Sequence, residues 1–352
     1  MLGLGLAAGC ELEFKGGPTE LQLSARSREL LGEGPAAEDL EQHLVRLFGT
    51  AAAPRDGLAD VDGAQLAGIE GPESLLELGR SLYERKCLHC HGNEGGGDGI
   101  TSQTLRPVPR DFRRGVFKFD DIKHGAKPEL ADLERVIAAG IDGTAMISSQ
   151  DLSEREIEAL ARYVRWLAAR GEVELLLAAE HEGEEEITAG QAAEVLALVR
   201  ERWADPRRER VQVPPVPAAT RESVLRGREL FHDAQGANCA SCHGEGGRAP
   251  GPAAFGPSVD SPEEQVPLLF DLWGHPAQPT NLVEDRFRHG RTPESVYTRI
   301  FLGIDGSAMP GLGEAVREDG SRRFSDQDLW AIVHYVLALD DPDWSATLEE
   351  QP

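Results

Sequence analysis

The sequence is poor in basic residues, in methionine and in long apolar runs, and each scarcity narrows what the chain can do. Its 352 residues include 36 Lys and Arg against 61 Asp and Glu, which argues against binding nucleic acid or an anionic membrane surface by charge. No apolar stretch reaches the roughly 18 residues that a membrane-spanning helix needs. Beyond the initiator, the only methionines are Met146 and Met309, so their positions are informative.

Four of the five cysteines lie in two copies of the pattern C-x-x-C-H. The copies are Cys87-Leu88-His89-Cys90-His91 and Cys239-Ala240-Ser241-Cys242-His243. This pattern is the attachment signature of c-type haem, in which two thiols form thioethers with the porphyrin and the adjacent imidazole binds the iron. The sequence therefore predicts two covalently bound haem c groups, attached at Cys87, Cys90, Cys239 and Cys242.

A C-x-x-C pair also occurs in zinc sites and in dithiol redox centres. A four-ligand zinc site needs a second pair close by, whereas the two motifs stand 152 residues apart and each ends in His. A thioredoxin-like centre requires a βαβ setting, and no strand pattern surrounds either motif. Haem attachment is the favoured interpretation.

The two methionines occupy near-identical heptapeptides, one downstream of each motif. Gly140-Ile141-Asp142-Gly143-Thr144-Ala145-Met146 and Gly303-Ile304-Asp305-Gly306-Ser307-Ala308-Met309 agree at six of seven positions. A single Met usually fills a gap in a core, but a repeated setting indicates a common chemical role. We expect the iron ligands to be His91 with Met146 and His243 with Met309. Ligation by His and Met raises the reduction potential and fills both axial positions, which suits electron transfer.

Hydrophobic periodicity and breaker residues divide the chain into two similar units. The first unit is predicted over residues 71–170 and the second over 220–345. Residues 1–70 are predicted to be an N-terminal processing segment and an extended arm, and residues 171–219 a helical and Pro-rich connector. The helices expected from the periodicity start near Pro72, at Thr220 and near Ser325, and span 38–48, 129–139, 153–169 and 188–203.

Two glycines predict close helix crossings. Gly79 stands four residues before Tyr83, and Gly227 stands four residues before Phe231, on the first helix of each unit. A glycine lets two helix backbones approach closely, while aromatic side chains fix the crossing. We expect the partner on the closing helix to lie near Tyr163 in the first unit and near its equivalent, Tyr335, in the second.

The order of these elements resembles a class I cytochrome c domain: helix, C-x-x-C-H, Gly-rich loop, helix, Met loop and a final helix bearing an aromatic residue. The segment Pro107–Lys118, with Pro109-Arg110-Asp111-Phe112 inside it, is similar to dihaem cytochromes c associated with bacterial respiratory chains. Pro279-Thr280-Asn281-Leu282 is its expected counterpart in the second unit. The resemblance implies an all-α fold of tandem class I cytochrome c domains, each a small helical bundle around a covalent haem.

The same resemblance implies that a backbone carbonyl fixes the proximal His of each motif. The candidates are Pro107 or Pro109 for His91, and Pro250 or Pro252 for His243. The families also commonly place Pro directly after the ligand Met, as Pro310 follows Met309; Met146 is followed instead by Ile147.

The resemblance further implies an electron-transfer protein rather than an enzyme. It would pass single electrons between respiratory redox partners such as a membrane oxidase, a quinol-oxidising complex or a dehydrogenase. The alternative is a dihaem cytochrome c peroxidase, to which residues 225–231 are faintly similar, and which needs one iron with an open distal position. Two further alternatives are that His124 or His289 replaces one Met ligand, and that a haem only stabilises a docking module.

Residues 106–127 carry seven Lys or Arg against three acids. One explanation is that these residues offset haem propionates, and the other is a docking face for an acidic partner.

Haem attachment to this motif in bacteria takes place outside the cytoplasmic membrane, so we expect a periplasmic protein or one on the outer face of the cytoplasmic membrane. Cys10 follows small residues similar to a lipoprotein processing site, and its diacylation would provide an anchor without a span. Membrane contact is expected only through that anchor or through a partner complex.

Overall fold

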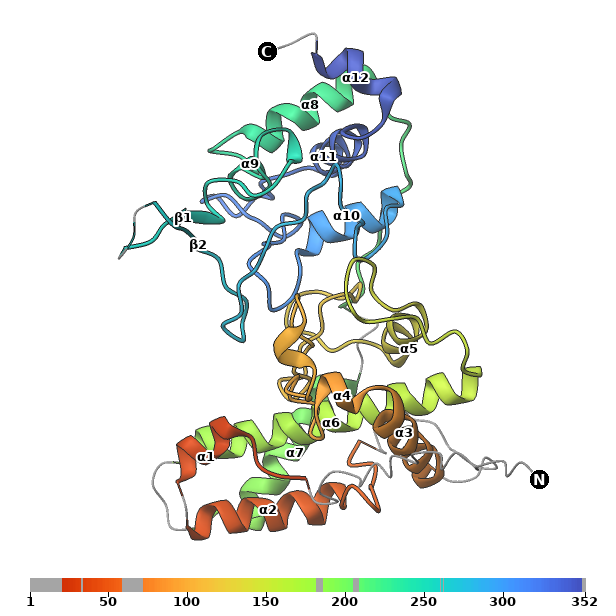
Figure 1. Ribbon diagram of the computed structural model, residues 1–352, viewed down its shortest axis with the longest axis vertical. Coiled ribbons are helices and arrows are strands. Elements are labelled where there is room, and N and C mark those ends of the chain that lie inside the picture. Colours follow the sequence, from red (N-terminus) through yellow and green to blue (C-terminus); the bar gives the residue numbers. More distant parts are fainter. Residues whose placement is uncertain are drawn as a thin grey trace, which may run out of the picture.

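The computed structural model describes residues 21–32, 34–58, 72–181, 186–204, 209–259, 261 and 263–349. Within these residues the chain is mostly helical, and its one sheet is the two-stranded pair β1 (Phe255–Pro257) and β2 (Gln265–Pro267). Figure 1 shows one helical body formed by the N-terminal half and a second formed by the C-terminal half, with the β hairpin projecting from the second. The predicted all-α fold class is confirmed.

The first body follows the predicted order of helices. Its elements are α3 (Pro72–Lys86), α4 (Leu88–His91), η1 (Ser102–Thr104), α5 (Leu130–Ala139) and α6 (Glu154–Glu180). α6 begins at a capping box in which Ser153 accepts from the Glu156 backbone while the Glu156 carboxylate accepts from the Ser153 backbone.

α6 is longer than the sequence pattern predicted. Its expected end near residue 169 is wrong, because the helix continues through Gly171 to Glu180, about three turns further. Gly171 lies against Arg113, and a Cβ there would stand 2.5 Å from the Arg113 Cα. The glycine therefore serves a close backbone approach inside the helix. The extension buries Val173 and Leu177, which carry the first core beyond the predicted unit.

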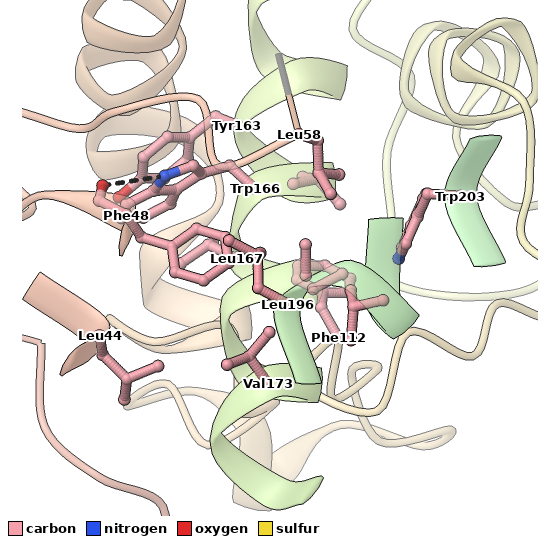
Figure 2. Packing of buried hydrophobic residues seen from close by; sticks show 14 of the residues in the cluster. Leu44, Phe48, Leu58, Phe112, Tyr163, Trp166, Leu167, Val173, Leu196 and Trp203 are labelled. Atoms are coloured by element: carbon pink, nitrogen blue, oxygen red, sulfur yellow. Dashed lines mark hydrogen bonds between the residues drawn. The ribbon is translucent and has the colours of Figure 1, made fainter. Parts of the chain in front are cut away.

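The described part of the N-terminal arm packs into this first core. It contains α1 (Ala25–Leu31) and α2 (Pro35–Phe48), which lie against α6, as does α7 (Ala189–Ala204) of the connector. Leu44 and Phe48 of α2 are fully buried, and Figure 2 shows Phe48 beside Trp166 of α6. The Trp166 indole N–H donates to the Arg55 carbonyl at 2.8 Å. Helices outside the haem unit thus complete its hydrophobic core.

The second body repeats the order of the first. Its elements are α8 (Arg221–His232), α9 (Ala240–His243), η3 (Glu245–Gly247), α10 (Pro293–Leu302), α11 (Asp326–Ala338) and α12 (Pro342–Glu349). A capping box at Ser325 starts α11 where it was predicted, and one at Thr220 starts α8 at the predicted beginning of the second unit. A separate core of buried side chains from α8, α10 and α11 holds this body together.

Both predicted helix crossings are confirmed. A Cβ on Gly79 would stand 2.1 Å from the Ala159 carbonyl oxygen, and one on Gly227 would stand 1.9 Å from that of Ala331. No side chain fits in either space, so the helix backbones touch. The aromatic pairs lie beside the crossings, with ring centroids 5.3 Å apart for Tyr83 and Tyr163 and 5.2 Å apart for Phe231 and Tyr335.

The crossing in the second body generates a stability prediction. Gly227→Ala is expected to lower the free energy of unfolding by about 2 kcal/mol, because overpacking outweighs the roughly 1 kcal/mol by which Ala is the better helix former. Gly190→Ala in α7 is the matched control, since a Cβ there has only the Thr188 hydroxyl 3.8 Å away. Denaturant unfolding followed by circular dichroism should show the loss in the first variant only. Equal stabilities for the two variants would contradict the close crossing.

Candidate haem-binding sites

Each C-x-x-C-H motif forms one helical turn that begins at its first cysteine. Cys87 is the N-cap of α4 and Cys239 is the N-cap of α9. The backbone N–H of His91 donates to the Cys87 carbonyl at 2.9 Å, and the second motif has the same bond, from His243 to Cys239, at 2.8 Å. The turn holds two thiols and one imidazole close together, which is the arrangement that a doubly attached haem requires.

A backbone carbonyl orients each proximal histidine. His91 Nδ1 donates to the Arg110 carbonyl at 3.1 Å, and His243 Nδ1 donates to the Thr280 carbonyl at 3.0 Å. A carbonyl can only accept, so the proton lies on Nδ1 and the Nε2 lone pair is left for a metal. In this respect both sites fit haem iron.

The four prolines that the resemblance offered as sources of the accepting carbonyl are the wrong residues. Pro107 and Pro109 precede the true acceptor of the first site, and Pro250 and Pro252 lie far in sequence from that of the second. The acceptors are Arg110 and Thr280, each the second residue of its matched tetrapeptide. The expected correspondence of Pro109–Phe112 with Pro279–Leu282 is therefore confirmed by geometry.

Two glycines in left-handed conformations hold these tetrapeptides in place. The Gly95 carbonyl accepts from the Phe112 N–H at 2.7 Å, and the Gly247 carbonyl accepts from the Leu282 N–H at 2.8 Å. Their φ angles are +74° and +72°, values that strain any other residue. Phe112 then stacks on the His91 ring at 4.6 Å between centroids. The sequence did not predict these two backbone hydrogen bonds or the stacking of Phe112 on His91, although the repeated tetrapeptide was a signal for them.

Burial sets the protonation of the motif side chains. It lowers the pKa of His91 to about 4 and also lowers that of His243, so both imidazoles are neutral at neutral pH, as a metal ligand must be. Burial raises the pKa of Cys87 to about 11 and that of Cys239 to about 12. A reactive dithiol needs a lowered thiol pKa, so these cysteines suit covalent attachment better than dithiol redox chemistry.

The zinc alternative finds no support in the described part of the chain, where no three His, Cys, Asp or Glu residues form a group suited to a metal ion. Within the described residues none of the four motif cysteines forms a disulfide. Cys10 lies outside the described residues.

The two Met loops have the same backbone hydrogen bonds. In the first, the Ile141 N–H donates to the Met146 carbonyl at 2.9 Å, and the Met146 N–H donates to the Thr144 hydroxyl at 3.1 Å. The second repeats both bonds: Ile304 N–H to Met309 carbonyl at 3.2 Å and Met309 N–H to Ser307 hydroxyl at 3.2 Å. The repeated heptapeptide thus encodes a repeated loop. The assignment of Met146 and Met309 as iron ligands remains a prediction.

The basic segment 106–127 lies at the junction with the second body. Lys118 Nζ stands 3.8 Å from the Asp271 carboxylate, and Lys123 Nζ stands 2.8 Å from that of Glu314. An Arg114 guanidinium nitrogen donates to the Leu272 carbonyl at 3.3 Å. Neither explanation of this charge excess anticipated contacts between the two bodies.

The histidines considered as alternative ligands also lie at this junction. His124 contacts the Asp305 carboxylate, and His289 Nε2 stands 3.0 Å from that of Asp121. The His289 ring stacks on Phe119 with 6.0 Å between centroids. Each histidine therefore has a partner in the opposite body, which accounts for their positions without iron.

Comparison with known families matches each body separately. Residues 74–164 match the family cytochrome c oxidase, cbb3-type, subunit III, and residues 224–340 match the family cytochrome c. The chain contains two cytochrome c domains in tandem. With the motif geometry, the matches confirm two covalently bound haem c groups, and domains of this kind serve haem-based electron transfer.

Among solved structures, the cytochrome is similar to a chain of the Kuenenia stuttgartiensis reducing HAO-like protein complex Kustc0457/Kustc0458. The two chains are 26% identical with a TM-score of 0.55, over 75% of this chain and 96% of the other. No curated protein matches the cytochrome.

The motif geometry predicts that the haems attach independently. The double variants C87A/C90A and C239A/C242A should each keep one covalent haem, because the two domains have separate cores. Mass spectrometry of the denatured protein counts the haems, with C90A alone as a control that keeps one thioether at the first site. Loss of both haems from either double variant would contradict independent attachment.

Proposed function

We propose that this cytochrome is a dihaem electron carrier that passes single electrons between respiratory redox proteins, with axial pairs His91/Met146 and His243/Met309. The observation that carries the proposal is the equivalence of the two Met loops, which share sequence and hydrogen bonding. An iron with both axial positions filled by protein cannot bind a substrate directly, and this suits electron transfer. The peroxidase alternative requires one iron with an open distal position, and therefore one Met loop that differs from the other.

The protein groups around each haem would hold and shield the ligand imidazole. Bound haem supplies a one-electron couple to each domain. The Arg110 and Thr280 carbonyls hold the imidazoles in one orientation, so each ring would present Nε2 to a bound haem iron in a fixed direction. Phe112 covers the His91 ring and keeps water from it. No side chain has to donate or remove a proton.

The haem-attachment motif and Cys10 bear on where the protein is located and on what it contacts. We infer a periplasmic or outer-face location, because bacteria attach haem to this motif outside the cytoplasmic membrane. Among the described helices none is long and apolar enough to cross a bilayer. Membrane contact would come from a lipid on Cys10 or from a partner complex. The similar chain from Kuenenia stuttgartiensis belongs to a complex, which supports a protein partner here.

The axial ligands are tested by the far-red sulfur-to-iron absorption of the oxidised protein. We expect two equivalents in the native protein, one in Met146→His and one in Met309→His, with a lowered potential at the altered iron. Ile147→Ala, which changes the exposed residue beside Met146, is the control and should keep both equivalents. One equivalent or none in the native protein would contradict Met at both irons, and turnover with peroxide would then support an enzyme.

Charge predicts which redox reagents react fastest. The formal net charge is −25, and the junction engages several of the lysines and arginines of segment 106–127. A cationic cobalt complex should therefore oxidise the reduced cytochrome faster than an anionic one of similar potential, and salt should slow this reaction. Stopped-flow rates at several ionic strengths measure both effects. Faster reaction with the anionic complex would instead support a basic docking face.

A further inference from the structure

A short hairpin of the second domain carries a tryptophan into the junction. Residues 269–277 form this hairpin-shaped loop, which follows β2, and its two arms meet where the Ala277 N–H donates to the Leu269 carbonyl at 2.9 Å. At the turn, the Asp271 carboxylate accepts from the Trp273 N–H at 3.0 Å and from the His275 N–H at 2.9 Å. These bonds fix the tip of the hairpin and with it the direction of the Trp273 side chain.

The first domain meets one side of this tryptophan. The Arg110 guanidinium lies over the Trp273 ring, with its carbon 3.6 Å from the ring centroid. The carbonyl of the same residue accepts the proton of His91 Nδ1 at 3.1 Å. Arg110 is therefore the single residue that lies between Trp273 and His91, the proximal ligand expected for the first haem.

The Met309 loop of the second domain meets another side of the ring. A Cβ on Gly306 would stand 2.5 Å from Trp273 Cζ3, so the ring packs directly on the Gly306 backbone. The neighbouring Leu272 N–H donates to the Gly306 carbonyl at 2.8 Å. Trp273 is thus held between the proximal side of one site and the Met loop of the other.

We propose that Trp273, seated on Arg110, forms the route by which an electron crosses between the two haems. This rests on the proposed function, since it takes both irons as one-electron centres. In the step, one electron leaves the reduced iron and reaches the oxidised iron; no bond forms or breaks, and Trp273 is not itself oxidised. Electron tunnelling falls steeply with the width of any gap, so a continuous line of packed atoms favours this route.

The indole nitrogen adds a second observation. Trp273 Nε1 is buried and has no hydrogen-bond partner within the described part of the chain. A buried indole N–H normally donates to an acceptor. Protein atoms cover this nitrogen, so the indole edge that carries it is packed into the junction.

The contacts of Arg299 and His124 across the junction are of a different kind. Arg299 donates to the Lys118 carbonyl at 3.1 Å and stands 3.3 Å from the Asp121 carboxylate. His124 contacts Asp305 of the Met309 loop, but the segment around His124 does not orient a haem ligand. These contacts fix the domains relative to each other, while Trp273 connects the ligand-bearing segments.

The test is the rate of intramolecular electron exchange in the half-reduced holoprotein. Exchange between haem methyl resonances gives this rate by NMR, after extrapolation to zero protein concentration removes intermolecular exchange. Trp273→Leu is expected to slow the exchange about tenfold, and Trp273→Phe, which keeps a ring in the junction, should lose less. Trp344→Leu is the matched control, because Trp344 lies in α12, at the end of the second domain away from this junction (Figure 1).

A separate variant distinguishes the route from the domain arrangement. Arg299→Gln removes contacts across the junction and leaves Trp273 in place, so its exchange rate should stay within about twofold of the native rate. Small-angle X-ray scattering checks that the radius of gyration is unchanged in each variant. Native exchange in Trp273→Leu, or equal slowing in Arg299→Gln, would overturn the proposal. Failure of the axial-ligand assignment would appear separately, in the far-red absorption of the native protein.

Discussion

The bond from each proximal imidazole to a backbone carbonyl is the constraint on which both sites depend. Burying an imidazole without a partner for its N–H is costly, and the carbonyls of Arg110 and Thr280 remove that cost. The carbonyl can serve only if its segment is fixed, which Gly95 and Gly247 accomplish through their own backbone bonds. In the first domain the same constraint also fixes where the Arg110 side chain lies, and so places it at the junction with the second domain.

Features written in local sequence were predictable. The helix starts near Ser153, Thr220 and Ser325 have capping side chains three residues apart, and those interactions need no information from elsewhere in the chain. The crossings at Gly79 and Gly227 were predictable because each domain repeats the same pattern. Because the same pattern occurs in both domains, one sequence was enough to recognise the crossings.

Features that depend on distant backbone atoms were not predictable. A carbonyl acceptor has no side-chain signature, so Arg110 and Thr280 could not be distinguished from the neighbouring prolines. Gly171 resembled a helix end, but its lack of a side chain is used against Arg113, more than fifty residues earlier in the chain. The lysines of segment 106–127 find their acids at positions such as Asp271 and Glu314, which composition cannot reveal.

The junction makes two nearly identical Met loops inequivalent. In the first loop Asp142, Gly143 and Ala145 are exposed, and Ile147, which follows Met146, is 81% exposed. In the second loop Asp305, Gly306 and Ala308 are partly covered, because Trp273 packs on Gly306 and Val116 of the first domain approaches it; Pro310, which follows Met309, is exposed like Ile147. The proposed His/Met coordination would then have different dielectric surroundings in the two domains, and solvent exposure is one of the factors that set haem potentials. Two haems with the same proposed ligands would therefore differ in potential through the junction alone.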